Sequence, residues 1–589
     1  MHASRLEMRK PLMLQKRSDV NRRIFTFKAM IILGMTVVAA RLFVLEVLDH
    51  GFYEALAENQ HGLFETFYPE RGTVYLTDMK SPDGRFPAAV NKDVWLVYAD
   101  PRLVMNPVAV SLQLAPLLEL DEKELADKLE QKSSAYQPLK HKVTEETAAK
   151  IRALDVKGIG FAREQLRVYP DSPEGAQTIG FVGSDENGER VGRYGVEGFW
   201  NTQLSGETGF MATEKDPLGR WIGSAARDLR PARDGDDLTL TIDRMIQHVA
   251  CSKLREAVEQ HGATGGSVVI MRPKSGAILA MCGYPDFDAN AYSSVTDMSL
   301  YNNPVIFSPY EPGSIFKPLT MAAAIDAGKV APNTTYDDEG SVVIGQYTIK
   351  NSDGKSNGIQ TMTQVLEKSL NTGAIFAVRS LGPEAFQKYV EDFGFGQLTG
   401  VDLDTEAPGN TESLSKRGEI WSATASFGQG ISVTPLQMAA AFSALANGGK
   451  LIKPFVVDSV RHPDGTVQKT EPVAVRQVIT KRASTLVSGM LVRVVENGHG
   501  KKAGVPGYWV AGKTGTAQIP AKDGSGYEKD VTIGSFAGFA PVDDPAFVMV
   551  VRIDRPKDTP WAETSAAPVF GDIAKFLLQY MEIPPDRIH

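Results

Sequence analysis

The chain has 589 residues, which is enough for two to four domains. Its 71 acidic and 63 basic residues give a net charge of -8 at pH 7, which argues against a nucleic-acid-binding protein, because such proteins present a basic surface. The nine histidines form no HExxH pair and no cluster with cysteine, so we expect neither a metal site nor a cofactor.

The N-terminus combines a basic leader with an apolar stretch. Residues 1–28 are rich in Lys and Arg, and their only acidic residues are Glu7 and Asp19. Residues 29–40 are apolar or small. With the flanking apolar residues the stretch is about 22 residues long, enough to span a bilayer if Lys28 and Arg41 snorkel. We therefore predict a cytoplasmic tail at 1–23 and a single transmembrane helix at 24–48, with the rest of the chain outside the cytoplasm. A signal peptide cleaved near Ala40 is the alternative.

Residues 49–230 have the pattern of a mixed module. The stretches 72–75 and 94–98 favour strands, residues 121–129 favour a helix opened by a capping box at Asp121, and residues 144–154 favour a second helix. Residues 226–237 are rich in Arg, Asp, Pro and Gly, which is typical of a boundary between domains. We therefore expect a second domain at 231–589.

The second domain has the pattern of an α+β fold. Residues 237–242 alternate as a strand does, and a helix is expected to follow through Val258. Two hairpins are predicted, one pairing 267–271 with 277–282 and one pairing 532–540 with 546–553, and residues 565–581 favour a closing helix. The pattern predicts an antiparallel sheet flanked by helices. Cys251 and Cys282 lie in apolar stretches typical of buried thiols, and a single bridge between them is the weaker alternative.

Ser314 and Lys317 form the first candidate catalytic pair. Pro312 and Gly313 break the chain just before them, and the apolar run at 319–325 predicts a helix that starts near Ser314. Residues three apart lie on one helix face, and a desolvated lysine close to another cation can be neutral and act as a base. Lys513 would be that second cation. Taken alone, the pair is better explained by an ordinary exposed helix start, because S-x-x-K is a common pattern.

Lys513, Thr514, Gly515 and Thr516 follow a strand-like stretch at 508–511. Gly515 has no side chain, so a substrate backbone could approach closely there, and a peptide could lie beside this strand. Thr514 and Thr516 share one face by strand alternation, which makes them candidates for binding a substrate carboxylate.

Two further patterns need interpretation. Ser369 and Asn371 lie at a break after a helix, where Ser369 could relay a proton and Asn371 could orient a substrate amide, although a helix cap is an alternative explanation. Residues 507–514 match the Walker A phosphate-loop pattern letter for letter. We interpret this match as a coincidence, because its middle residues favour a strand and no helix is expected after Thr514.

The three motifs S-x-x-K, S-x-N and K-T-G occur in the order typical of penicillin-binding proteins and class A β-lactamases. With them the chain resembles the class B penicillin-binding proteins from its anchor to its C-terminus. The further stretches that resemble this family are 70–73, 167–170, 195–198 and 204–206 in the pedestal, and 427–430, 434–437 and 446–449 before the K-T-G strand. No stretch resembles the glycosyltransferase domain of class A members.

The resemblance implies a peptidoglycan D,D-transpeptidase in the bacterial cytoplasmic membrane, inhibited by β-lactam antibiotics and partnered by a SEDS-family glycan polymerase. It implies that Ser314 attacks a stem peptide, that Lys317, Ser369, Asn371 and Lys513 assist, and that the backbone N–H groups of Ser314 and Thr516 form the oxyanion hole. The length and residues 400–402 favour an FtsI-like division enzyme. The alternatives are an elongation enzyme, a carboxypeptidase or β-lactamase-like hydrolase, and a non-catalytic scaffold.

Overall fold

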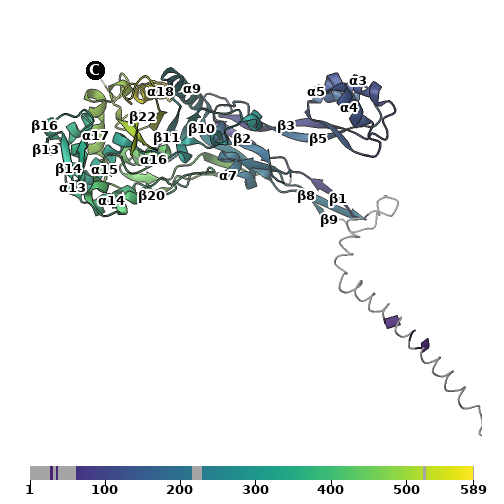
Figure 1. The fold of residues 1–589 in the computed structure, drawn as a ribbon, viewed down its shortest axis with the longest axis horizontal. Helices are drawn as coiled ribbons and strands as arrows, with labels where there is room; N and C mark the ends of the chain where they lie inside the picture. Colours follow the sequence, from purple (N-terminus) through teal and green to yellow (C-terminus); the bar gives the residue numbers. More distant parts are fainter. Residues whose placement is uncertain are drawn as a thin grey trace, which may run out of the picture. The chain divides into compact units, whose positions relative to one another are not determined.

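The computed structural model describes residues 27–28, 30, 35–36, 62–186, 188–214, 228–521 and 526–587 (Figure 1). The transmembrane helix predicted at 24–48 lies outside these ranges except for a few positions. Among the described residues, no helix combines the length and apolarity needed to cross a bilayer. The chain forms two compact units, of which the first comprises Met1–Pro69 with Glu207–Arg233. Its described strands, β1 (Gly62–Phe67), β8 (Gly209–Glu214) and β9 (Asp228–Arg230), form an antiparallel sheet.

The second unit comprises Glu70–Gly206 with Asp234–His589. Its pedestal part is built on a seven-stranded sheet. The predicted strands at 72–75 and 94–98 appear as β2 (Val74–Thr77) and within β3 (Arg85–Ala99). The parallel neighbour of β2 is β10 (Asp237–Asp243), so the predicted boundary at 226–237 lies just before a strand that extends the pedestal sheet. The other members are β4 (Gln137–Val143), β5 (Ile159–Val168), β18 (Val457–Arg461) and β19 (Val467–Lys469).

Three helices form a small lobe against β3, β4 and β5: α3 (Pro107–Leu118), α4 (Glu122–Leu129) and α5 (Glu145–Arg152). Both helices predicted here are present. Asp121 accepts a hydrogen bond from Glu124 N at 2.9 Å, as expected of an N-cap. Leucines of α3 and α4 and Ile151 of α5 make the buried core of this lobe.

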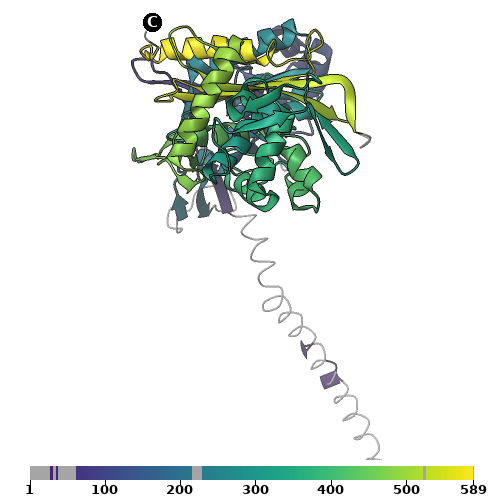
Figure 2. The same cartoon turned by 90° about the vertical axis from the view of Figure 1, so that its left-hand side faces the viewer.

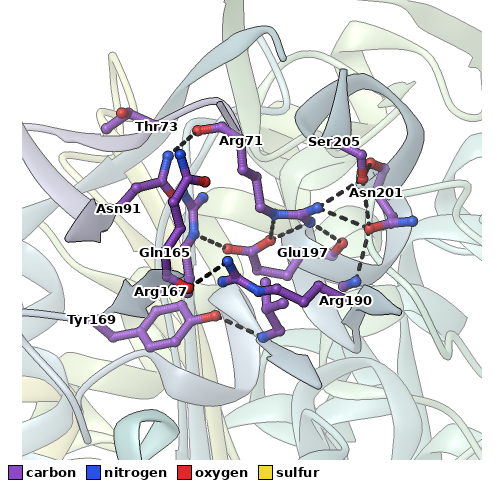
Figure 3. Close-up of polar contacts among 12 residues, drawn as sticks. Arg71, Thr73, Asn91, Gln165, Arg167, Tyr169, Arg190, Glu197, Asn201 and Ser205 are labelled. Carbon is purple, nitrogen blue, oxygen red and sulfur yellow. Dashed lines mark hydrogen bonds and ion pairs between the residues drawn. The ribbon is translucent and has the colours of Figure 1, made fainter. Parts of the chain in front are cut away.

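A buried ionic cluster links the pedestal stretches that resemble the family (Figure 3). Glu197 is fully buried, and its carboxylate accepts hydrogen bonds from Arg71 Nε at 2.8 Å and from Arg167 Nε at 2.7 Å. Arg71 also donates to Asn201 and Ser205. Burial opposes ionisation of Glu197, but the two guanidinium groups outweigh it and lower the pKa. Between β5 and β8 the chain forms α6 (Ala176–Ile179), β6 (Phe181–Ser184), β7 (Arg190–Arg193), α7 (Gly195–Phe199) and α8 (Asn201–Ser205).

The catalytic domain is built on a five-stranded antiparallel sheet, which confirms the predicted α+β fold. Its order is β12 (Ile278–Tyr284), β11 (Gly265–Met271), β23 (Phe547–Asp554), β22 (Tyr527–Ala540) and β21 (Ala511–Pro520). Both predicted hairpins are present, as β11–β12 and β22–β23. Helices α9 (Arg244–Gln260) and α18 (Ala566–Tyr580) cover one face of the sheet, and α16 (Pro435–Ala446) packs on the other (Figure 1). In Figure 2, α18 is the yellow helix that lies along the sheet.

Cys251 of α9 and Cys282 of β12 form a disulfide, with their Cα atoms 5.4 Å apart. The expectation of two buried thiols is therefore wrong. The two residues lie 31 positions apart, and they meet because α9 packs directly against β12. Apolar neighbours suit a buried disulfide as well as a buried thiol, so the local sequence did not separate the two.

A helical region packs beside β21 and β22 and completes the catalytic domain. Its helices are α10 (Pro304–Phe307), α11 (Lys317–Asp326), α12 (Met362–Glu367), α13 (Asn371–Leu381), α14 (Pro383–Asp392), α15 (Glu419–Ala425) and α17 (Lys481–Asn497). Its short strands are β13 (Thr335–Asp338), β14 (Ser341–Ile344), β15 (Tyr347–Lys350), β16 (Gly358–Thr361), β17 (Lys450–Ile452) and β20 (Ala474–Gln477). The buried α11 packs against α13 and α17, so that segments far apart in sequence meet beside β21.

Candidate active site

Ser314 lies in a 3-10 turn, η4 (Gly313–Phe316), directly before α11. The sequence predicted Ser314 at the helix start, and the structure places it one turn earlier. Pro318 occupies the first turn of α11, where its missing N–H leaves no intrahelical hydrogen bond unmade. Gly313 has a φ of 57°, a left-handed conformation that glycine adopts readily. The turn leaves Ser314 partly exposed on the wall of a cleft.

Two lysines lie buried beside the cleft. Lys317 and Lys513 are 1% and 0% exposed. Lys317 Nζ donates to Ser369 O at 2.5 Å and to Ser369 Oγ at 3.2 Å, whereas Lys513 Nζ donates to Thr514 O at 3.0 Å and to Thr514 Oγ1 at 3.3 Å. Lys317 thus contacts Ser369 of the S-x-N motif, and Lys513 contacts Thr514, the next residue of its own strand.

Burial changes the proton affinity of both lysines. It lowers the pKa of Lys317 well below the usual lysine range, and the positive charge of Lys513 lowers it further. Burial lowers the pKa of Lys513 to about 7, although the negative charge of Glu563 acts to raise it. The pKa of Lys513 suits a group that exchanges protons near neutral pH, and the lowered pKa of Lys317 favours its neutral form, so this pair fits general acid–base chemistry.

Ser369 and Asn371 lie at the junction between α12 and α13. Ser369 has a φ of 58°, which is uncommon for a residue with a side chain, and its N–H donates to Leu366 O at 3.3 Å. Asn371 is the first residue of α13, and its side-chain amide donates to Lys350 O at 2.9 Å. Both residues line the cleft, together with Ser314.

The K-T-G residues lie within β21, which begins at Ala511, so most of the strand-like stretch predicted at 508–511 precedes the strand. Thr514 and Thr516 line the cleft, so the predicted shared face is present. Gly515 points to the opposite side, where an added Cβ would lie 2.8 Å from Pro312 O. The close approach at Gly515 is therefore made by the segment that leads into Ser314. Because β21 continues to Pro520, the phosphate-loop match at 507–514 lacks the following helix that such a loop needs.

The cleft has a volume of about 1140 Å³. Sequence reasoning missed several of its lining residues, which belong to no short motif and come from separate segments: Tyr347, Trp421, His499, Trp561 and Glu563. His499 Nδ1 lies 3.0 Å from Glu563 Oε2. Among the described residues, no group of three or more His, Cys, Asp or Glu side chains could hold a metal ion. The side chains that meet here are suited to acyl transfer by a serine.

Comparison with known proteins gives two family matches. Residues 266–575 match the penicillin binding protein transpeptidase domain, and residues 66–240 match the penicillin-binding protein dimerisation domain. Stage V sporulation protein D of Bacillus subtilis is 38% identical, covering 88% of this chain and 80% of the relative. The peptidoglycan D,D-transpeptidase FtsI homolog of Mesostigma viride is 28% identical, covering 96% of this chain and 98% of the relative.

The fold is also similar to that of solved structures. Penicillin binding protein 3 of Mycobacterium tuberculosis, complexed with aztreonam, is 26% identical with a TM-score of 0.67, covering 89% of this chain and 98% of that chain. The serine–lysine site lies within the transpeptidase match, and the dimerisation match precedes it in the same chain. This chain belongs to the class B penicillin-binding proteins.

Proposed function

We propose that this protein is a peptidoglycan D,D-transpeptidase that crosslinks stem peptides through an acyl-enzyme on Ser314. The observation that carries the proposal is the pair of buried lysines, Lys317 and Lys513, whose pKa values are both lowered beside the serine-lined cleft. A neutral amine close to a serine can accept its proton, which is what a serine nucleophile needs.

The proposed acylation begins when Ser314 Oγ attacks the carbonyl carbon of the penultimate D-Ala of a stem peptide. Lys317 accepts the hydroxyl proton, and backbone N–H groups of Ser314 and Thr516 stabilise the oxyanion. The peptide C–N bond then breaks, the serine ester remains, and the terminal D-Ala leaves with a proton passed through Ser369 and Lys513. Thr514 and Thr516 hold the terminal carboxylate of the donor, and Asn371 orients its amide.

The second half-reaction distinguishes a transpeptidase from a hydrolase. In the proposed function an amine of a neighbouring stem attacks the ester, forms the crosslink and regenerates the Ser314 hydroxyl. The purified full-length protein should release D-Ala from a pentapeptide donor and, on addition of an amine acceptor, give crosslinked product in proportion to that acceptor. Hydrolysed donor alone, at every acceptor concentration, would favour a carboxypeptidase or β-lactamase-like enzyme. Absence of both products would favour a non-catalytic scaffold.

The proposed setting is septal cell-wall synthesis in the bacterial cytoplasmic membrane. The basic leader and the apolar residues 29–40 support a single membrane anchor with an extracytoplasmic catalytic domain. We propose a SEDS-family glycan polymerase as the partner and β-lactams as inhibitors. The relative named FtsI homolog supports a division role, whereas the relative named stage V sporulation protein D supports a role in sporulation. Depletion in the source bacterium decides: filaments support division, round cells support elongation, and a defect confined to spores supports sporulation.

A further inference from the structure

A buried carboxylate lies behind the S-x-N motif, outside the three motifs. Asp338, the last residue of β13, is 0% exposed. Its Oδ1 accepts hydrogen bonds from Thr372 Oγ1 at 2.7 Å and Asn351 Nδ2 at 2.9 Å, and its Oδ2 accepts from Asn357 Nδ2 at 2.8 Å. The backbone N–H groups of Gly340 and Asn357 add further hydrogen bonds. Burial would raise the pKa of Asp338, but these donors together lower it.

The ionised carboxylate determines which way the side chain of Asn351 faces. A carboxylate only accepts hydrogen bonds, so the amide nitrogen of Asn351 must face Asp338 and its oxygen must face away. There Asn351 Oδ1 accepts from Asn371 N at 2.9 Å and from Thr372 N at 3.3 Å. These are the first two N–H groups of α13, whose N-cap residue, Leu370, has no side-chain acceptor. Asn351 thus caps α13 from 20 residues upstream.

The same segment also holds the side chain of Asn371. Its amide nitrogen donates to the carbonyl of Lys350, the residue before Asn351. Asn371 is therefore fixed through its main chain and through its side chain, which leaves its Oδ1 to accept an N–H group from a substrate in the cleft. Ser369, two residues earlier, has a positive φ, and such a conformation persists only where the surrounding structure holds it.

We propose that Asp338 is a positioning residue for acylation. Through Asn351 and Thr372 it holds the start of α13, and thereby keeps Ser369 against Lys317 and Asn371 toward the substrate. Asp338 touches neither the nucleophile nor the substrate itself. The inference rests on the proposed function, because acylation of Ser314 is the step that this arrangement serves.

The test is the acylation of the full-length protein by benzylpenicillin, with the initial binding constant and the limiting acylation rate measured separately. Asp338→Asn keeps the size but places an NH₂ group among hydrogen-bond donors. We expect it to reduce the acylation rate at least about tenfold and to change initial binding less than about threefold, because misplaced groups mainly lose rate. Asn351→Ala removes the cap alone and should reduce the rate to a similar extent.

Two comparisons separate positioning from general destabilisation. The swap Asp338→Asn with Asn351→Asp restores one carboxylate and one amide to the pair, with a carboxylate now capping α13, and should recover part of the rate lost in Asp338→Asn, since the NH₂ of residue 338 still meets the donors from Gly340 and Asn357. Glu197→Gln is the matched control, since it also weakens a buried, hydrogen-bonded carboxylate, but in the pedestal cluster. It should lower the melting temperature and leave the acylation rate unchanged.

The inference is overturned if folded Asp338→Asn acylates at the wild-type rate. If that variant does not fold, a wild-type rate for Asn351→Ala overturns it, and so does an equal loss of rate in Glu197→Gln. A reduced rate in Asp338→Asn or Asn351→Ala, absent in Glu197→Gln and partly recovered in the swap, supports it. Wild-type protein that benzylpenicillin does not acylate would instead overturn the proposed function.

Discussion

Replacement of Lys513 by methionine should stabilise the protein and abolish its reaction with β-lactams. Methionine has a similar volume without a charge, so the buried site stays filled. Burial lowers the pKa of Lys513 from 10.5 to about 7. Since each tenfold change in proton affinity is about 1.4 kcal/mol, keeping this lysine buried costs about 4 kcal/mol of folding free energy at pH 7. Losing two hydrogen bonds to Thr514, at about 1 kcal/mol each, offsets about half of the gain. The expected net stabilisation is about 2 kcal/mol.

The sign of the pH dependence follows from the lowered pKa. Between about pH 7 and 10.5 the unfolded lysine binds a proton that the folded lysine has lost, so wild-type stability rises with pH in this window. At about pH 9 the cost of burying Lys513 falls to about 2 kcal/mol, and the advantage of Lys513→Met should nearly vanish. Thermal melts of both proteins at pH 7 and 9 measure this. A variant that melts below wild type at pH 7, or a gap that widens with pH, would refute the reasoning.

Three further outcomes are expected. Glu197→Gln leaves two buried guanidinium groups without a full counter-charge and should destabilise the protein by about 3–5 kcal/mol in urea unfolding; an unchanged transition would contradict the buried cluster. Reduction of the disulfide should raise the intact mass by two hydrogens, and replacing Cys251 and Cys282 by serine should destabilise the protein by about 2–4 kcal/mol. Free thiols in the native protein, detected by alkylation, would argue against the bridge. Gly515→Ala should slow β-lactam acylation, since its Cβ would press on Pro312, before Ser314; a wild-type rate would contradict that packing.

Local patterns in the sequence predicted the two hairpins of the five-stranded sheet and the helices α9, α11 and α18. The stretches at 267–271 and 532–540 become β11 and part of β22, because β-branched and aromatic residues bounded by turn residues favour strands. Pro318 is compatible with the helix predicted after Ser314, since it lies in the first turn of α11, where a helix tolerates proline. Thr514 and Thr516 share the face that strand alternation predicted for them.

What the sequence did not predict depends on tertiary contacts. The bridge between Cys251 and Cys282 requires α9 to lie on β12, and neither cysteine's neighbours specify that packing. Gly515 was expected to leave room for a substrate, but the facing element is the turn before Ser314, which is distant in sequence. Asp338 and Asn351 escaped notice because Asp and Asn in short loops are ordinary turn residues. Only the fold shows that they hold α13.

The central claim is that Ser314 forms the acyl-enzyme, and intact-protein mass spectrometry after treatment with benzylpenicillin tests it most directly. We expect one adduct of the full mass of the antibiotic on the wild-type chain, located by digestion to the peptide that contains Ser314. Ser314→Ala, with a melting temperature close to that of wild type, should carry no adduct. An adduct of the same mass on Ser314→Ala, or one located on another residue of the wild-type chain, would contradict the account.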